Sequence, residues 1–438
     1  MVEQVSAGAT GALGDISMSG YDYNDLSGMM ENIRTGSTGG LAHITMDGYS
    51  ADNVSHLTTK IKSGGSGALG NIRMSGYDHS NPGCTYTTAI TGGCSQLVGG
   101  TMQGVELSLD WAVSTFAGTA SQWGGYTDGT GAAAVFRYPT SITTDGTNLY
   151  VADYNNHRIR KIVIDNGSVT TLAGSASSGY DDGIGINARF VRPSGITTDG
   201  TNLYVAESGN HQIRKIVIDN GSVTKLAGYR YSDDTDGTGE DARFDTPVDL
   251  TTDGTNIYVT DNKNHSIRKV VIDNGTVTTF AGTSGSSGST DGTGTAARFK
   301  NPTGITTDGT NLYVVDQGNL TIRKIVISSG VVTTLAGTAG GNNYAVIDDT
   351  GPDAAFNTPN RITTDGTNLY VTEYNKQLIR KIVISSGVVT TVAGTNNSAG
   401  STDGTGADAR FKKPHGFTSD GTSLYLADSD NHLIRKID

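Results

Sequence analysis

The stretch Phe190-Val-Arg-Pro-Ser-Gly-Ile-Thr-Thr-Asp-Gly-Thr-Asn-Leu-Tyr-Val-Ala-Glu207 decides the fold of this chain. It continues through Ile-Arg-Lys-Ile-Val-Ile to a second turn, Asp219-Asn220-Gly221. Asp-Gly and Asn-Gly pairs supply the positive φ angles of tight hairpins, so the apolar runs between them are strands. The unit therefore parses into four strands, with cores at Ile196–Thr198, Leu203–Ala206, Ile213–Ile218 and Val223–Ala227.

This unit occurs six times, and the register follows from one proline at the start of each copy. The prolines lie 54 to 57 residues apart, at Pro139, Pro193, Pro247, Pro302, Pro359 and Pro414. The third strand of each unit is apolar on both faces, as expected for a sheet packed between two neighbours. Four-stranded sheets repeated about an axis are propeller blades. The sequence predicts an all-β fold, with a six-bladed β-propeller in residues 113–438.

The two ends of the repeat region predict how the ring closes. The sixth unit stops after its third strand, at Ile434–Asp438, and lacks a fourth strand. Val113-Ser-Thr-Phe-Ala-Gly118 precedes the first unit and matches the missing segment. We therefore expect residues 113–118 to join the last blade as its outer strand, since an open blade would expose an unpaired edge.

A tripeptide after the second strand carries a family resemblance. Asn431-His432-Leu433 is the motif for which NHL repeats are named, and this part of the chain resembles that family. Close variants begin at Asn156, Asn210 and Asn264, whereas blade four has Asn319-Leu320-Thr321 and blade five Lys376-Gln377-Leu378. The resemblance implies a β-propeller and leaves the function open, because one fold hosts many roles.

Residues 1–110 carry a different repeat of 28 residues, which separates them from the propeller at 111–438. Its four copies align Leu13, Leu41, Leu69 and Leu97, and likewise Met18, Met46, Met74 and Met102. Each copy is consistent with two short strands and a polar turn, which favours a small β-domain or a stacked β-rod for attachment or self-assembly. Cys84 and Cys94 form a possible disulfide there, provided that the segment between them loops back.

Charge and composition narrow the partners. The formal net charge is −12 with no basic cluster, so neither nucleic acid nor an anionic membrane surface is expected as a partner. No apolar run approaches the roughly 20 residues of a membrane span, so no membrane insertion is expected. The composition suggests an extracellular or cell-surface protein, although no signal peptide is visible at Met1-Val-Glu-Gln4.

Several repeated polar residues are predicted to be structural. An acid ends each second strand and an arginine follows seven residues later, as in Asp153 and Arg160, so each acid should pair with the arginine of its own blade. The motif histidines are spread over separate blades, and we expect them to be satisfied structurally. They are His157, His211, His265 and His432.

The segments between blades raise two further possibilities. Asp181–Gly185 and Asp234–Gly239 hint at calcium loops without the full ligand pattern, so calcium is a minor possibility and no other cofactor is expected. A recurring phenylalanine is expected to fill the cleft between blades, at Phe190, Phe244, Phe299 and Phe411.

Candidate ligand-binding residues lie where the repeat is broken. The connections from the fourth to the first strand and from the second to the third share one face, here called the loop face, where binding residues are expected. Its aromatic candidates are Trp123, Tyr126, Tyr180, Tyr229, Tyr231 and Tyr344. Near the axis, Asp249, Arg361 and His415 replace small residues or Asn, and they predict either a polar pocket or an isolated ion pair between blades.

Three functions remain open at this point. The first is a non-enzymatic binding or adhesion module that recognises a surface glycan or protein. The second is a subunit of a surface filament that polymerises through residues 1–110. The third, a metal-dependent lyase or hydrolase, has the least support, because six similar blades offer no distinguished catalytic residue or metal site.

Overall fold

The computed structural model describes residues 16–19, 44–47, 72–75, 111–120, 124–340 and 345–438. The chain separates into two compact units, Met1–Asp110 and Trp111–Asp438. Cys84, Cys94, Trp123 and Tyr344 lie outside the described residues. In the described parts, no helix is long and apolar enough to cross a membrane.

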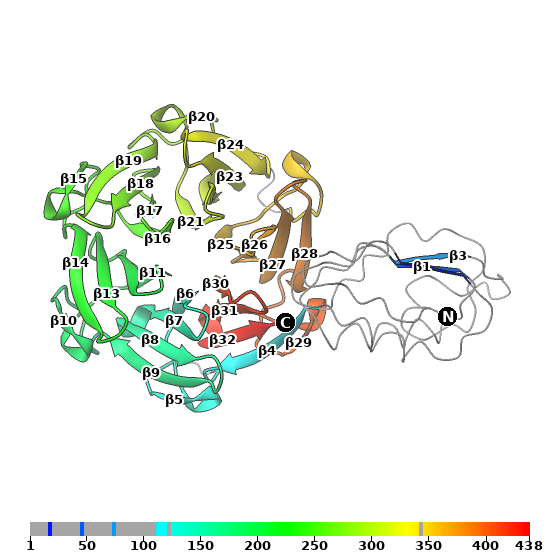
Figure 1. Ribbon diagram of the computed structural model, residues 1–438, viewed down its shortest axis with the longest axis horizontal. Helices are drawn as coiled ribbons and strands as arrows, with labels where there is room; N and C mark the ends of the chain where they lie inside the picture. The colour runs from blue at the N-terminus through cyan, green and yellow to red at the C-terminus, as the bar shows by residue number, and fades with distance from the viewer. Residues whose placement is uncertain (1–15, 20–43, 48–71, 76–110, 121–123, 341–344) are drawn as a thin grey trace. The chain divides into compact units, whose positions relative to one another are not determined.

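Residues 111–438 form six antiparallel sheets around a central axis, which confirms the predicted six-bladed propeller (Figure 1). The innermost strand of each blade begins at the repeat proline. These strands are β6 (Pro139–Thr144), β11 (Pro193–Thr198), β16 (Pro247–Thr252), β21 (Pro302–Thr307), β25 (Pro359–Thr364) and β30 (Pro414–Ser419). The second strands end at the repeated acid. They are β7 (Asn148–Asp153), β12 (Asn202–Glu207), β17 (Asn256–Asp261), β22 (Asn311–Asp316), β26 (Asn368–Glu373) and β31 (Leu424–Asp428).

The third strands carry the repeated arginine and a lysine between apolar residues, and the fourth strands lie outside them. The third strands are β8 (Arg158–Val163), β13 (Gln212–Val217), β18 (Ser266–Val271), β23 (Thr321–Val326), β27 (Leu378–Val383) and β32 (Leu433–Ile437). Five blades take the fourth strand from their own repeat. These are β9 (Ser168–Ala173), β14 (Ser222–Gly228), β19 (Thr276–Gly282), β24 (Val331–Ala336) and β28 (Val389–Gly394).

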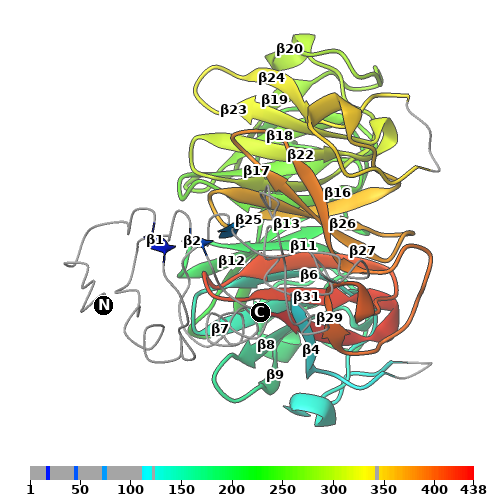
Figure 2. The ribbon, with the colours of Figure 1, turned by 90° about the vertical axis from the view of Figure 1, so that its right-hand side faces the viewer.

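The sixth blade takes its fourth strand from the start of the propeller, as the sequence predicts. Strand β4 (Ala112–Ala117) pairs antiparallel with β32, with Val113 opposite Ile437 and Ala117 opposite Ile434. Figure 2 shows β4 beside β29 and the last blade. The two ends of the propeller are thus held together by a ladder of backbone hydrogen bonds.

The blades carry one feature that the four-strand parse misses. In five of them a Gly-Thr or Gly-Ile pair of the connecting segment adds a two-residue strand outside the fourth. These are β5 (Gly129–Thr130), β10 (Gly183–Ile184), β15 (Gly237–Thr238), β20 (Gly292–Thr293) and β29 (Gly404–Thr405). Two residues give too little periodicity to be recognised as a strand in a sequence. The connecting segment therefore covers part of the outer edge of the blade that it leads into.

Short 3₁₀ turns complete the blades. One group follows the outer two-residue strand or its equivalent: η1 (Gly131–Ala133), η3 (Gly185–Asn187), η4 (Gly239–Asp241), η5 (Gly294–Ala296), η7 (Gly351–Asp353) and η8 (Gly406–Asp408). The other group follows the second strand: η2 (Tyr154–Asn156), η6 (Gln317–Asn319) and η9 (Ser429–Asn431).

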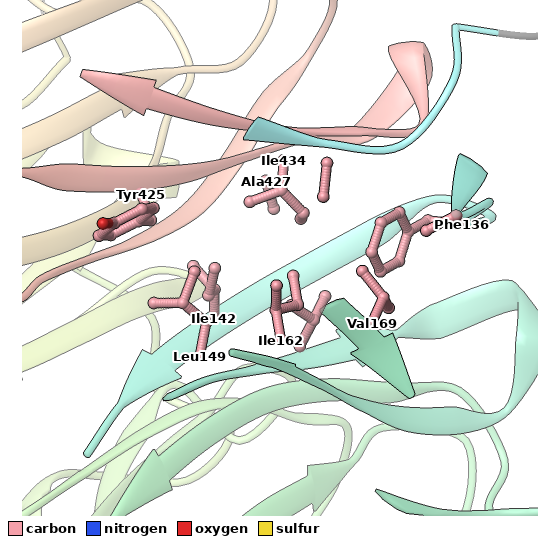
Figure 3. Close-up of a cluster of buried hydrophobic side chains, with 11 residues drawn as sticks. Phe136, Ile142, Leu149, Ile162, Val169, Tyr425, Ala427 and Ile434 are labelled. Atoms are coloured by element: carbon pink, nitrogen blue, oxygen red, sulfur yellow. The ribbon is translucent and has the colours of Figure 1, made fainter. Parts of the chain in front are cut away.

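The hydrophobic core lies in the clefts between neighbouring blades. Figure 3 shows one such cluster, in which Phe136 and Ile142 of blade one pack with Tyr425 and Ile434 of blade six. Phe190, Phe244, Phe299 and Phe411 occupy the equivalent clefts, fully buried, which confirms their predicted role. Burial of one such side chain contributes on the order of 1.5–3 kcal/mol.

In the N-terminal unit the structure describes three four-residue strands. They are β1 (Ile16–Ser19), β2 (Ile44–Asp47) and β3 (Ile72–Ser75), and they form one parallel sheet. Ile16, Ile44 and Ile72 face one another in register. Since these positions are 28 residues apart, each step of the sheet corresponds to one sequence repeat.

Candidate binding site at the axial mouth

The third residue of each innermost strand determines what occupies the axis. Around the ring, glycine alternates with a residue that has a side chain: Ser141, Gly195, Asp249, Gly304, Arg361 and Gly416. A Cβ added at Gly195 would lie 2.7 Å from the Cα of Asp249, and one at Gly304 would lie 2.8 Å from the Cα of Arg361. The glycines are therefore needed for close approach of the strands, and at this position three of the six blades carry a side chain.

Asp249 and Arg361 meet across the axis although blade four lies between their blades in the sequence. The Nε atom of Arg361 lies 3.7 Å from Oδ2 of Asp249. Arg361 donates to Oδ1 of Asn360 at 3.0 Å and makes longer contacts, 3.5 and 3.4 Å, to the carbonyls of Ser194 and Val248. Burial raises the pKa of Asp249 to about 6, and the Arg361 charge opposes that rise. Asp249 and Arg361 therefore form an ion pair near the axis.

Two threonines position this pair. The backbone N–H of Asp249 donates to Thr260 at 3.0 Å, and that of Arg361 donates to Thr372, also at 3.0 Å. The other four blades have Ala or Val at the threonine position. The charged residue and the supporting hydroxyl thus occur together in blades three and five, a paired signal that sequence reasoning missed.

The ion pair lies between two hollows on the axis. A cavity of about 400 Å³ opens on the loop face and is lined by Arg361, His415 and side chains from the connections around them. A second cavity of about 130 Å³ lies on the other side and is lined by Asp249, Arg361 and a threonine from every blade. Arg361, only 3% exposed, contributes to both cavities. The pocket therefore exists together with the ion pair, and Arg361 lies at its floor.

The wall of the larger cavity, here called the axial cavity, combines aromatic and charged groups. Tyr138, Tyr154 and Tyr374 line it. The Lys413 ammonium lies 5.4 Å from the centre of the Tyr374 ring and 3.4 Å from a carboxylate oxygen of Asp430. Tyr154 and Tyr374 replace Ser, Asn or Gln at the first position after the second strand of the other blades. The break-in-repeat signal that selects Arg361 would have found them too.

His415 lies in the same wall and is neutral. Burial, and then the nearby charge of Arg361, lower the pKa of His415 well below its usual value, while a hydrogen bond with the backbone of Thr140 partly offsets them. Its Nδ1 atom has no hydrogen-bond partner in the described structure. The Tyr374 ring meets the imidazole edge-on, with ring centres 5.2 Å apart. Arg361 thus pairs with Asp249 and shares the axial cavity with His415.

The aromatic candidates on the connections form two separate groups away from the axis. Tyr180, Tyr229 and Tyr231 surround the guanidinium of Arg230 at 5.8, 5.7 and 5.2 Å. Tyr180 is 51% exposed and Tyr231 is 62% exposed. Tyr126, in blade one, lies under Arg158 at 4.4 Å. These residues form exposed cation–aromatic contacts and do not line the axial cavity.

The repeated arginines are structural, as predicted, and each binds two acids. In blade three, Arg268 pairs with Asp261 at 3.0 Å and with Asp236 of the connecting segment at 2.7 Å. It also donates to the carbonyls of Arg243 and Thr235. The same double pairing occurs in all six blades, at Arg160, Arg214, Arg268, Arg323, Arg380 and Arg435.

The Asp-Gly stretches considered as calcium loops each contain an acid that is bound to a repeated arginine. Asp182 and Asp236 are bound to Arg214 and Arg268. Among the described residues, no three His, Cys, Asp or Glu side chains gather in a way that could hold a metal ion.

The motif histidines connect neighbouring blades. Nδ1 of His157 accepts a hydrogen bond from the backbone N–H of Arg192 in the next blade, at 3.2 Å. His211, His265 and His432 do the same for Thr246, Asn301 and Tyr138. Each donor residue precedes the repeat proline and has a positive φ angle. In blade five Gln377 replaces the histidine as acceptor, toward Lys413. The structural role predicted for these histidines is confirmed.

Comparison with known proteins agrees with the propeller. Residues 136–162 match the family described as NHL repeat. Human NHL repeat-containing protein 2 is 27% identical over 337 residues, which cover 69% of this chain and 46% of that protein. The chain thus spans about half the length of the curated relatives it matches.

Solved structures with the same architecture come from Bacteroides thetaiotaomicron. One, of unknown function, has a TM-score of 0.57 and 23% identity, covering 78% of this chain and 79% of its own. Another, an auxiliary nutrient binding protein, has a TM-score of 0.57 and 17% identity, covering 75% and 76%. At these identities the likeness concerns the fold alone.

Proposed function

The propeller of this chain is an NHL-repeat β-propeller, and on that premise we propose that the chain is a non-enzymatic binding module. Its loop face recognises a surface glycan or a protein. The observation that carries the proposal is the axial cavity of about 400 Å³, whose lining departs from the repeat in several blades at once. Concave sites with a few convergent polar groups are where proteins bind ligands.

The chemistry of the cavity supports binding over catalysis. Its buried cation, Arg361, faces the carboxylate of Asp249, and Lys413 faces that of Asp430. His415 has no carboxylate partner that would raise its basicity and make it a general base. Groups paired in this way suit recognition of a ligand through hydrogen bonds.

The N-terminal repeats attach or space the propeller in this proposal, and the protein works outside the cell or at its surface, as its composition suggests. A specific observation also favours a second candidate, a filament subunit. Strands β1, β2 and β3 stack in parallel with a constant shift of one repeat. Parallel stacking of this kind extends readily between copies. Negative-stain microscopy of the full chain would show polymers under the second candidate and separate particles under the first.

The binding proposal is tested with the full chain on an array of glycans and purified glycoproteins. Tyr229→Thr on the loop face introduces the residue found at Thr283 in blade four, so the variant should fold. Asn220→Ser on the opposite face copies Ser329 in the same way and is the matched control. The loop face is supported if binding is weakened by Tyr229→Thr, or by replacing a residue that lines the axial cavity, and is preserved by Asn220→Ser. Equal loss in both types of variant, or no binding at all, contradicts it.

A further inference from the structure

We propose that the axial cavity accepts a single neutral sugar ring, the terminal hexose of a glycan. This inference rests on the proposed binding function and names the ligand class of its central site.

The charges around the cavity cancel. Arg361 is opposed by Asp249, Lys413 is opposed by Asp430, and His415 is neutral. An ionic ligand would therefore find no net countercharge, and its desolvation would not be compensated. A neutral polar ligand does not incur that cost.

The hydrogen-bonding groups are of both kinds. Arg361 is a donor whose Nη2 atom has only long contacts, 3.4 and 3.5 Å, to carbonyls. Asp430 contributes acceptor oxygens, and Asn155, Ser208 and Ser429 add groups that donate and accept. A hydroxyl both donates and accepts. A polyhydroxylated ring can therefore pair with each of these groups, whereas a carboxylate can only accept.

The walls suit the apolar face of a sugar. Tyr138, Tyr154 and Tyr374 place three amphipathic rings around the opening, and Val248 adds an apolar patch. The volume of about 400 Å³ falls within the range of small-molecule sites, roughly 300–1,000 Å³. A peptide bound as an extra strand would instead need an exposed sheet edge, and the short outer strands cover part of that edge in five blades.

The test is saturation-transfer NMR on the full chain with glucose, galactose and mannose, and with glucuronic and galacturonic acid as charged comparators. A ligand of about a dozen non-hydrogen atoms should bind with a Kd on the order of 1 mM. We expect at least one neutral hexose to show saturable binding, and the glucuronic and galacturonic acids to bind about tenfold more weakly than that hexose.

Variants copied from other blades keep the fold intact. Tyr374→Ser introduces the residue of Ser208 and Ser429, and His415→Thr introduces that of Thr140 and Thr303. Each should weaken hexose binding about tenfold, and Asn220→Ser on the far face should not change it. No saturable binding of any neutral hexose, equal or tighter binding of the acids, or binding unaffected by both cavity variants would overturn the inference. If the array signal persists and depends on Tyr229 but not on Tyr374, the sugar pocket is wrong and the binding module stands.

Discussion

The six repeated arginines and the single axial arginine are both buried, but their surroundings differ. Arg268 is fully buried and has two carboxylates and two carbonyls within 3.1 Å. Arg361 is equally buried, yet one hydrogen bond of 3.0 Å is its only close polar contact, and its carboxylate lies 3.7 Å away. A buried cation is inexpensive only when it is fully paired. The repeated arginines thus hold blades together, whereas Arg361 retains capacity for a ligand.

The largest effect on stability should come from removing the closing strand β4, which also supports the arginine network of blade six. Strand β4 completes blade six, and Thr115 in it donates to Asp403, a partner of Arg435. Deleting residues 1–118 should abolish cooperative unfolding and cause aggregation, because an apolar edge is exposed. Deleting residues 1–110 keeps β4 and should leave the melting temperature of the propeller unchanged. Calorimetry distinguishes the two, and a stable protein lacking residues 1–118 would contradict the closure.

Replacing one repeated arginine should have the next largest effect. Arg268→Met leaves Asp261 buried without its cation and should lower the free energy of unfolding by about 3–5 kcal/mol. Urea denaturation monitored by circular dichroism measures this. Lys269, next to it in the same strand and only half-buried, is the control, and Lys269→Met should change the stability by less than about 0.5 kcal/mol. Similar values for both variants would show that the buried network is not the stabilising element.

Replacing the axial arginine should cost less. Arg361→Ser introduces the residue of Ser141 and removes only one close hydrogen bond, so we expect a loss of about 1 kcal/mol. The Asp249 left behind still accepts a hydrogen bond from the backbone N–H of Ile305. The double variant Asp249→Ser/Arg361→Ser should recover most of that loss in the same urea experiment. A loss comparable to that of Arg268→Met would remove the distinction between the two kinds of arginine.

The smallest effect concerns a histidine between blades. Burial, and then the charges of Arg192 and Arg137, lower the pKa of His157 from its usual 6.5. The folded state therefore favours neutral His157, and its contribution is complete above pH 6.5 and is lost as the pH falls below that value. His157→Gln keeps an acceptor, as Gln377 does in blade five. Relative to this variant, the native protein should lose roughly 0.5–1 kcal/mol between pH 7 and pH 5. If the free energy of unfolding of the two proteins changes with pH in parallel, neutral His157 does not stabilise the contact between the blades.

The sequence predicted the fold well because the repeat supplies the same evidence six times. The turn pairs and the strand lengths follow from turn chemistry and hydrophobic pattern, and the displaced strand at Val113 follows from matching the repeat. The acid–arginine pairing was predicted for the same reason. The second acid of each pair, such as Asp236, was missed because its contact spans 32 residues and depends on the path of the connecting segment.

The site was predicted in part. Asp249, Arg361 and His415 stood out as breaks in the repeat, and they meet at the axis. Tyr154 and Tyr374 also break the repeat and could have been found in the same way, but only the closed ring shows that they and Lys413 border the axial cavity. Tyr180, Tyr229 and Tyr231 were selected as aromatic residues on long connections, but sequence position does not reveal that Arg230 gathers them away from the axis.

The alternation of glycine and larger residues along the axis limits how this molecule can change in size. Gly195, Gly304 and Gly416 each approach the following blade too closely for a Cβ atom, so junctions that require glycine alternate around the ring with junctions that accept a side chain. An even number of blades accommodates that alternation and an odd number does not. Gain or loss of a single repeat would therefore place two junctions of one kind side by side, whereas duplication of two adjacent repeats would preserve the pattern.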